Sequence, residues 1–129
     1  MKKPTAAVPF QFAIDYLYAL NPIVKPMFGC HAVYIGNKIV LILRNKKDEK
    51  LDNGVWIATT LEHHQSLKKD FPGMRSISVL GSSVTGWQLL PLEADDFESS
   101  VIKACDFILK NDVRIGKIPL PKKKVAGKK

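Results

Sequence analysis

The sequence predicts one α+β domain of two layers, in which helices cover an antiparallel sheet in the order α-β-β-β-α-β-β-α. The chain has 129 residues and is 46% apolar, which matches a single domain with one core. Three stretches repeat apolar residues at helical spacing, whereas several short apolar runs are separated by turn-forming residues. Short connections make neighbouring strands antiparallel, and helices must then cover the apolar face of the sheet.

The first helix is expected over about residues 9–20. Pro9 suits its first turn, where a missing N–H costs nothing, and Asn21-Pro22 ends the run. The apolar face of this helix carries Phe10, Ala13, Ile14, Leu17 and Leu20.

A strand over Met27–Ile35, a two-residue turn at Gly36-Asn37 and a return strand over residues 39–43 are expected next. Residues 39–43 are apolar throughout, which indicates a central strand with little surface facing water. Alternation places Phe28, Cys30, Ala32 and Tyr34 on one face of the first strand, and Gly29, His31, Val33 and Ile35 on the other.

Residues 45–54 read as a solvated polar loop and residues 55–58 as a third strand. Thr59 and Glu62 have the spacing of a capping box, in which each side chain satisfies an amide at the start of a helix. The second helix should therefore begin there, run to about Asp70 and end at residues 71–73.

Residues 77–80 and 87–90 are expected as the fourth and fifth strands, joined across residues 81–86. A third helix should open at Asp95, with Glu98 near its positive end. Its buried stripe is expected to consist of Phe97, Val101, Ala104, Cys105 and Ile108.

The positive charge is concentrated at the two ends of the chain. Residues 113–129 carry +7 with no acid, and Lys2 and Lys3 add +2, whereas residues 4–112 hold 11 basic and 12 acidic side chains. We therefore expect a flexible arm over residues 1–8, a nearly neutral domain over 9–119, and a disordered basic tail over 120–129. No apolar run is long enough to span a membrane and the N-terminus lacks a hydrophobic leader, so a cytoplasmic protein is expected.

The polar residues do not form a recognisable catalytic or metal-binding pattern, so no enzyme activity, metal or cofactor is expected. His63 and His64 are adjacent, whereas two ligands on one helix face need a spacing of three or four. Cys30 and His31 should diverge on opposite strand faces, which leaves the thiol without a base. Cys30 and Cys105 are too few for a disulfide framework, and we expect two buried, reduced thiols.

The C-terminal region offers the clearest candidates for contact with an acidic partner. Arg114 and Lys117 flank Gly116, so that Arg114 either clamps an acidic group or ties the chain back to the carbonyl groups that end the preceding helix. The tail lysines should give only weak, salt-sensitive and sequence-independent affinity for nucleic acid, and they are Lys122, Lys123, Lys124, Lys128 and Lys129.

From Met27-Phe28-Gly29, through Tyr34, to the turn at Gly36, the chain resembles the N-terminal domain of the TfoX family. The likeness extends over roughly residues 24–112, where an aromatic-bearing strand, a short acidic linker and a terminal helix agree in layout. It implies an α-β(3)-α-β(2)-α fold, also associated with YjbR-like proteins, and a link to the regulation of DNA competence. Cys30-His31 replace the small residues usual after the motif, and the resemblance implies no catalytic residues.

Three functional hypotheses follow. The first is a non-enzymatic binding or regulatory domain making protein or weak nucleic-acid contacts, with candidate positions Met27, Phe28, Gly29, Tyr34, Arg114 and Lys117. In structural terms, Phe28 and Tyr34 are expected to fill the core and Gly29 to permit close backbone approach. The second is a small-molecule or enzymatic pocket formed by His31, Cys30 and Arg114. The third is a homodimer that pairs sheets or edge strands, which residues 39–43 would favour at an edge.

Overall fold

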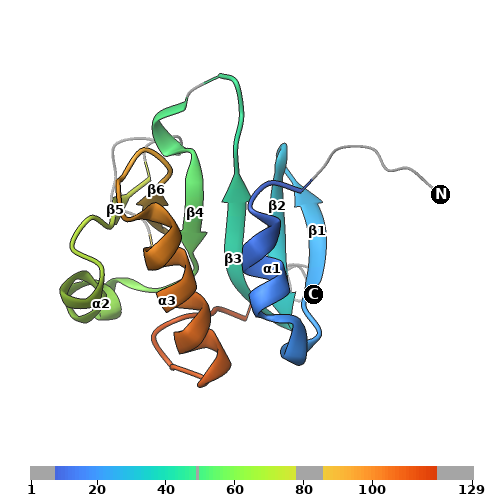
Figure 1. Ribbon diagram of the computed structural model, residues 1–129. Coiled ribbons are helices and arrows are strands. Elements are labelled where there is room, and N and C mark those ends of the chain that lie inside the picture. The colour runs from blue at the N-terminus through green and yellow to red at the C-terminus, as the bar shows by residue number, and fades with distance from the viewer. Residues whose placement is uncertain (1–7, 49, 78–85, 119–129) are drawn as a thin grey trace, which may run out of the picture.

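The computed structural model describes residues 8–48, 50–77 and 86–118, which form an α+β domain built on a six-stranded antiparallel sheet of strand order β1-β2-β3-β4-β6-β5 (Figure 1). This confirms the predicted fold class. The helices and strands are α1 (Gln11–Tyr16), the 3-10 turn η1 (Tyr18–Leu20), β1 (Ile23–Met27), β2 (Cys30–Ile35), β3 (Lys38–Arg44), η2 (Lys50–Asp52), β4 (Gly54–Ile57), η3 (Leu61–His63), α2 (His64–Asp70), β5 (Arg75–Ser76), β6 (Gln88–Pro91) and α3 (Phe97–Leu109).

All three helices contribute to one core on one face of the sheet. α1 and α3 lie side by side across that face (Figure 1), and the Tyr16 hydroxyl on α1 donates a hydrogen bond of 2.9 Å to the Asp106 carboxylate on α3. The predicted stripe of α3 is confirmed, since its five residues are all buried. They pack against the alternate sheet residues Val33, Leu41, Leu43, Val55, Ile57 and Leu90.

A second apolar cluster uses the other alternate residues of the strands. It is formed by Cys30, Ala32, Ile39, Ile42, Trp56, Ala58, Ile77 and Leu89, all buried. Strand β3 therefore contributes buried side chains to both faces, and it lies third in the sheet, which confirms its predicted central position. Because β3 has a strand on each side, it offers no free edge for pairing with a second copy.

The strand expected over Met27–Ile35 is two strands, and the sheet has one strand more than predicted. Residues 23–27 form β1 and turn back at Phe28-Gly29 into β2, with Met27 paired to Cys30. Pro26 made this strand hard to foresee, because proline is disfavoured within a sheet. It is tolerated here because β1 is an edge strand.

The capping-box prediction at Thr59 is wrong. The second helix is entered through the 3-10 turn η3, whose cap position is Thr60 without a side-chain hydrogen bond. Thr59 is buried and its hydroxyl donates to the carbonyl oxygen of Arg114 at 2.6 Å instead. A tertiary partner has thus replaced the local one, although the predicted end of the helix at Asp70 is confirmed.

Other element boundaries differ by a few residues. The first helix is regular only over α1 before it tightens into η1. α3 begins at Phe97, with Asp96 rather than Asp95 at its cap position and no capping bond from that side chain. The fourth strand is the short β5, Ile77 follows it as a buried residue, and residues 78–80 lie outside the described part of the chain.

The predicted basic tail over residues 120–129 lies outside the described residues, as does the predicted arm over 1–8 apart from Val8. None of the helices described has both the length and the apolar composition needed to cross a membrane.

Candidate functional site

Three connections meet at one end of the sheet, which we call the turn end: the Phe28-Gly29 turn, the β3–β4 loop over residues 45–53, and the β6–α3 connection over residues 92–96. The strand registers place them together, because His31 pairs with Leu43, Arg44 with Gly54, and Gly54 with Pro91. In Figure 1 they lie along the top of the domain.

The Met27-Phe28-Gly29 motif forms the hairpin turn between β1 and β2. Phe28 has a φ of 51° and Gly29 a φ of 79°. Positive φ at both central residues of a two-residue hairpin defines a type I′ turn, for which Asn-Gly is the preferred sequence. Glycine adopts this conformation freely, but a bulky side chain rarely does.

The Phe28 side chain points into solvent with 90% of its surface exposed, so the expectation that it fills the core is wrong. The turn interrupts the alternation of the strand at this residue. Met27 and Tyr34, by contrast, are partly buried against the second apolar cluster. Left-handed backbone costs a non-glycine residue about 1–2 kcal/mol. Phe28 therefore combines an unfavourable backbone with an unburied aromatic ring.

Lys46 of the β3–β4 loop lies against this turn. A Cβ atom placed on Gly29 would be 3.2 Å from the Lys46 Nζ, so the ammonium group packs over the glycine. Glycine at position 29 thus serves two purposes, the positive φ and the close approach of Lys46.

The base of the β3–β4 loop is held by Asn53, which is buried although a fully solvated loop was expected. The Asn53 side chain accepts from the backbone N–H of Lys46 and donates to its carbonyl, both at 2.9 Å. The buried Arg44 guanidinium donates to the same amide oxygen at 2.8 Å, and the Leu92 N–H donates to the Asn53 carbonyl at 2.9 Å. Asn53 therefore joins β3 and the loop through its side chain, and the β6–α3 connection through its backbone carbonyl.

Asp52 secures the far side of the loop. Its carboxylate is fully buried and pairs with Arg75 of β5 at 3.2 Å, while its carbonyl accepts from the Trp56 Nε1 at 2.9 Å. Arg75 also donates to the Leu51 carbonyl. Buried, satisfied polar groups therefore hold Lys46 and residues 51–53 at the base of the loop in one conformation.

Cys30 and His31 follow the turn but point to opposite faces of the sheet. Burial raises the pKa of the Cys30 thiol, although the nearby Arg44 and Lys46 charges favour the thiolate, and the Sγ lies 3.8 Å from the Phe28 carbonyl. The Nδ1 atom of His31 is buried and makes no hydrogen bond within the described residues. A protonated, buried thiol is a poor nucleophile.

Arg114 lies at the opposite end of the sheet and is occupied by internal partners. It pairs with Asp112 at 2.8 Å and Asp70 at 3.0 Å, and donates to the Ser66 hydroxyl at 2.7 Å. The hydrogen bonds that the Asp112 carboxylate accepts from the side chain and the backbone N–H of Arg114 lower the pKa of this carboxyl group. Arg114 thus ties the chain after α3 to side chains of α2, rather than to the helix-terminal carbonyls.

The structure does not bring Arg114 together with Cys30 and His31, so within the described part of the chain these three residues do not line a common pocket, as the second hypothesis requires. Lys117 is also placed at the far end, where it pairs with Ile39 of β3 and its ammonium lies 5.4 Å from the centre of the Trp87 ring. Gly116 has a φ of 115°, and a side chain there would collide with Lys38. These residues anchor the segment that leads to the tail, whose five lysines lie outside the described residues.

The remaining histidines have partners within the domain. His64 Nε2 lies 3.1 Å from the Gly86 carbonyl, and His63 lies 3.3 Å from the Glu62 carboxylate. Over the described ranges, no three His, Cys, Asp or Glu side chains are grouped so as to hold a metal ion.

Sequence reasoning singled out Met27-Phe28-Gly29, although as part of a strand rather than as a turn, and it missed Arg44, Lys46 and Asn53. The available signals were an arginine that closes an apolar strand and an Asn-Gly pair at the start of the next strand. Neither shows that the two side chains meet. Comparison of the chain with known protein families, with curated proteins and with solved structures finds no match in any of the three.

Proposed function

We propose that this chain is a non-enzymatic binding or regulatory domain of the TfoX N-terminal type, acting in the cytoplasm and contacting a protein partner through its turn end. The observation that carries the proposal is Phe28, which is 90% exposed on a left-handed backbone. Strained residues persist most often at functional sites, and exposed aromatics are the commonest anchors of protein interfaces. Burial of the Phe28 ring in a pocket of the partner would provide the hydrophobic free energy that the exposed ring does not provide in the isolated domain.

The charges of the turn end favour a protein over a nucleic acid at this surface. Lys46, Lys47 and Lys50 are offset by the carboxylates of the same end, which include Asp48, Glu93, Asp95, Asp96 and Glu98. The phosphate backbone of a nucleic acid would be repelled by these carboxylates, whereas a surface that carries charges of both signs and an exposed aromatic residue is typical of protein interfaces. Weak nucleic-acid contacts are assigned to the tail lysines.

The absence of an enzyme activity is part of the proposal. It is supported by the burial of Cys30, which raises the pKa of its thiol, and by the separation of Cys30 and His31 from Arg114. The resemblance to the TfoX N-terminal domain supports it as well, since it brings no catalytic residues. Binding therefore accounts for the site without any cofactor.

The test compares the wild-type chain with Phe28→Asn in quantitative co-purification from cells that express it. Asparagine suits the turn, so the variant removes the ring without disturbing the hairpin. Tyr18→Asn is the matched control, because Tyr18 is 79% exposed on η1, away from the turn end. We expect a protein retained by wild type and by Tyr18→Asn but lost with Phe28→Asn, and the purified pair should show the same order of affinity.

Retention of the same proteins by Phe28→Asn would refute a contact through this turn. If nuclease treatment removes all retained material, and replacing the five tail lysines with glutamine does the same, the chain acts through nucleic acid instead. Sedimentation of the purified chain at micromolar concentration identifies the remaining outcome, self-association.

A further inference from the structure

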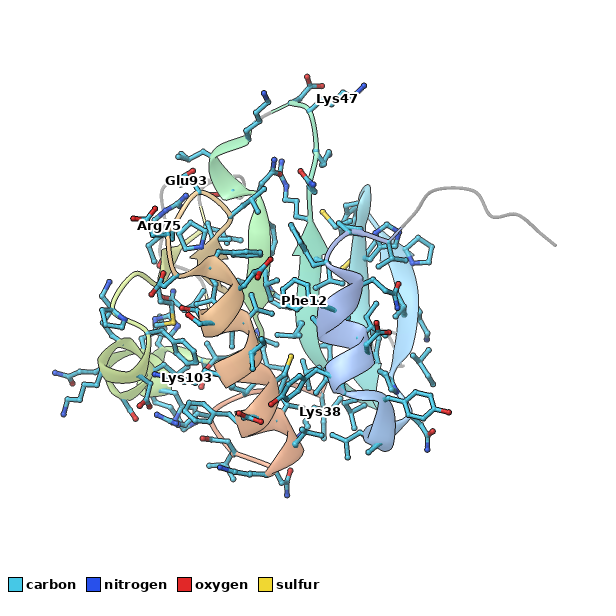
Figure 2. All side chains as sticks on the ribbon, in the orientation of Figure 1. Phe12, Lys38, Lys47, Arg75, Glu93 and Lys103 are labelled. Carbon is cyan, nitrogen blue, oxygen red and sulfur yellow. The ribbon has the colours of Figure 1, made fainter. Side chains whose placement is uncertain are left out.

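The second face of the sheet, opposite the helices, carries two partly exposed aromatic side chains. α1 and α3 cover the first face, where Figure 2 shows Phe12 between them, and no residue of the described helices belongs to the second apolar cluster. Tyr34 on β2 and Trp87, immediately before β6, pack against that cluster and are only partly buried. Aromatic rings on one face of an antiparallel sheet are a platform on which unpaired nucleic-acid bases stack.

The strand register aligns these rings in one row across the sheet, which we call the aromatic row. Its members are Ile23, Tyr34, Ile39 and Lys117, each the cross-strand partner of the next, and then Trp87, which lies beside Lys117. Cross-strand partners of antiparallel strands project to the same face. The aromatic row therefore forms an elongated surface that begins at the edge strand β1 and reaches the Trp87 ring.

A lysine ammonium group lies over each of the two rings. The Lys25 Nζ is 5.0 Å from the centre of the Tyr34 ring, and the Lys117 Nζ is 5.4 Å from the centre of the Trp87 ring. Neither lysine forms an ion pair with a carboxylate of the described residues. Such contacts are weak at partly exposed positions, so each ammonium group can move to a bound phosphate while a base takes its place on the ring.

The strands that form this face carry no acidic residue. None of the six strands described contains an aspartate or a glutamate, and neither do residues 77–87 or residues 113–129. The buried Asp52, shortly before β4, is paired with Arg75 of β5. The second face therefore carries a net positive charge, unlike the turn end, and this charge attracts phosphates.

We propose that the second face of the sheet binds single-stranded nucleic acid along the aromatic row, with bases stacked on Tyr34 and Trp87. Lys25 and Lys117 contact its phosphates, and the tail lysines, which follow Lys117 in the sequence, add further phosphate contacts. A duplex hides the faces of its bases, so rings set into a sheet stack only on unpaired ones. The site goes beyond the proposed protein contact at Phe28 and does not depend on it.

The test is a residue-resolved NMR titration of the full chain with an oligothymidylate of roughly ten nucleotides and, separately, with the matching oligouridylate. We expect saturable shifts of the amides of residues 23–25, 32–34, 39 and 117 and of the Trp87 indole N–H, with α3 unaffected. A response to one of the two strands only tells DNA from RNA. A duplex of equal length should leave the Trp87 indole unmoved, and equal shifts with the duplex would overturn the proposal.

Tyr34→Leu keeps an apolar side chain but removes one stacking ring, and should weaken the apparent Kd roughly tenfold. Tyr18→Leu makes the same change at an exposed tyrosine on η1 and should leave the Kd unchanged. Circular dichroism confirms that each variant is folded. If Tyr34→Leu does not fold, the titration of the wild type and the lysine variants decide the question.

Lys25→Gln/Lys117→Gln should weaken binding severalfold and reduce its dependence on salt, whereas Lys69→Gln/Lys110→Gln removes the same charge from exposed positions on α2 and after α3 and should not. Equal weakening by both pairs would show general ionic attraction and overturn the proposal.

Replacing the five tail lysines with glutamine should lower the affinity but keep the shifts along the aromatic row. Loss of those shifts would mean that the tail alone binds, which also overturns the proposal. Phe28→Asn should bind the oligonucleotide as wild type does, so failure of the protein contact and failure of this site are distinguishable.

Discussion

The Thr59 hydroxyl donates a hydrogen bond of 2.6 Å to the carbonyl oxygen of Arg114, which joins the end of β4 to the segment that follows α3. Next to it, the Gly116 N–H donates to the Ala58 carbonyl at 2.7 Å, and Lys117 exchanges two backbone bonds with Ile39. Hydrogen bonds thus connect this segment to β3 and to the end of β4, the two central strands, at the end of the sheet opposite the candidate site.

Thr59→Val keeps the shape of the side chain and removes its hydroxyl, which leaves the Arg114 carbonyl without this donor. Because Thr59 is 1% exposed, we expect the free energy of unfolding to fall by about 1–3 kcal/mol. Urea denaturation of the variant measures the loss. Thr60→Val is the matched control, since Thr60 is exposed and caps nothing, and a loss of equal size there would contradict the assigned role.

Phe28→Asn should stabilise the isolated domain, because asparagine is favoured at the first central position of a type I′ turn. Relief of the left-handed strain should raise the free energy of unfolding by about 0.5–1 kcal/mol. The same urea experiment tests this, with Tyr18→Asn expected to stay within about 0.5 kcal/mol of wild type. If Phe28→Asn instead destabilises the domain, the Phe28 ring contributes to folding. Its exposure would then no longer argue for a role in binding a partner.

Asn53→Ala should release the β3–β4 loop. The substitution removes the bonds to Lys46 and takes one acceptor from the buried Arg44, so we expect a loss of about 2–3 kcal/mol in the free energy of unfolding. Hydrogen exchange of the Lys46 amide should become faster, because this N–H loses its acceptor on Asn53. Asn45→Ala, in the same loop but exposed, should change neither quantity.

The Asp112–Arg114 pair should make stability fall in acid. The folded-state pKa of Asp112 lies below its ordinary value of 3.8, so its contribution is fully present above that pH and is lost as the pH falls through the lower folded value. Wild type should therefore exceed Asp112→Asn by on the order of 1 kcal/mol at pH 6, and the difference should shrink below pH 4. A difference independent of pH would exclude the ionised carboxylate as its cause.

Both thiols should resist modification in the folded chain. Cys105 is fully buried, and burial raises the pKa of its thiol to about 12, while Cys30 is buried against Arg44 with its pKa raised as well. With Ellman's reagent at pH 8 we expect slow reaction of the native protein and rapid reaction of two thiols in urea. Cys30→Ser and Cys105→Ser variants assign each phase, and a fast native phase from Cys30 would reveal an accessible thiolate.

The elements that the sequence predicted well are those whose pattern is local. The apolar stripe of α3 and the unbroken apolar run of β3 follow from side-chain periodicity within one element, and both were confirmed. Strand β1 was missed because Pro26 hides a short edge strand, and the competition for Thr59 was missed because its partner lies 55 residues away. Spacing in the sequence carries no information about such a partner.

The same division holds for the candidate site. The sequence by itself singled out Met27-Phe28-Gly29 as a motif and determined that residues 4–112 are nearly neutral, with the positive charge concentrated at the two ends of the chain. Only the tertiary structure decided that the Phe28 side chain is exposed to solvent and that Lys46 packs over Gly29. It also decided that Arg114 forms ion pairs with Asp70 and Asp112 at the end of the sheet opposite the turn end. The physical reason is twofold. The same residues can lie in a strand or in a turn, and this choice decides whether a side chain points to the core or to solvent. Which loops become neighbours depends on how the strands pair, and pairing joins residues that are distant in the sequence.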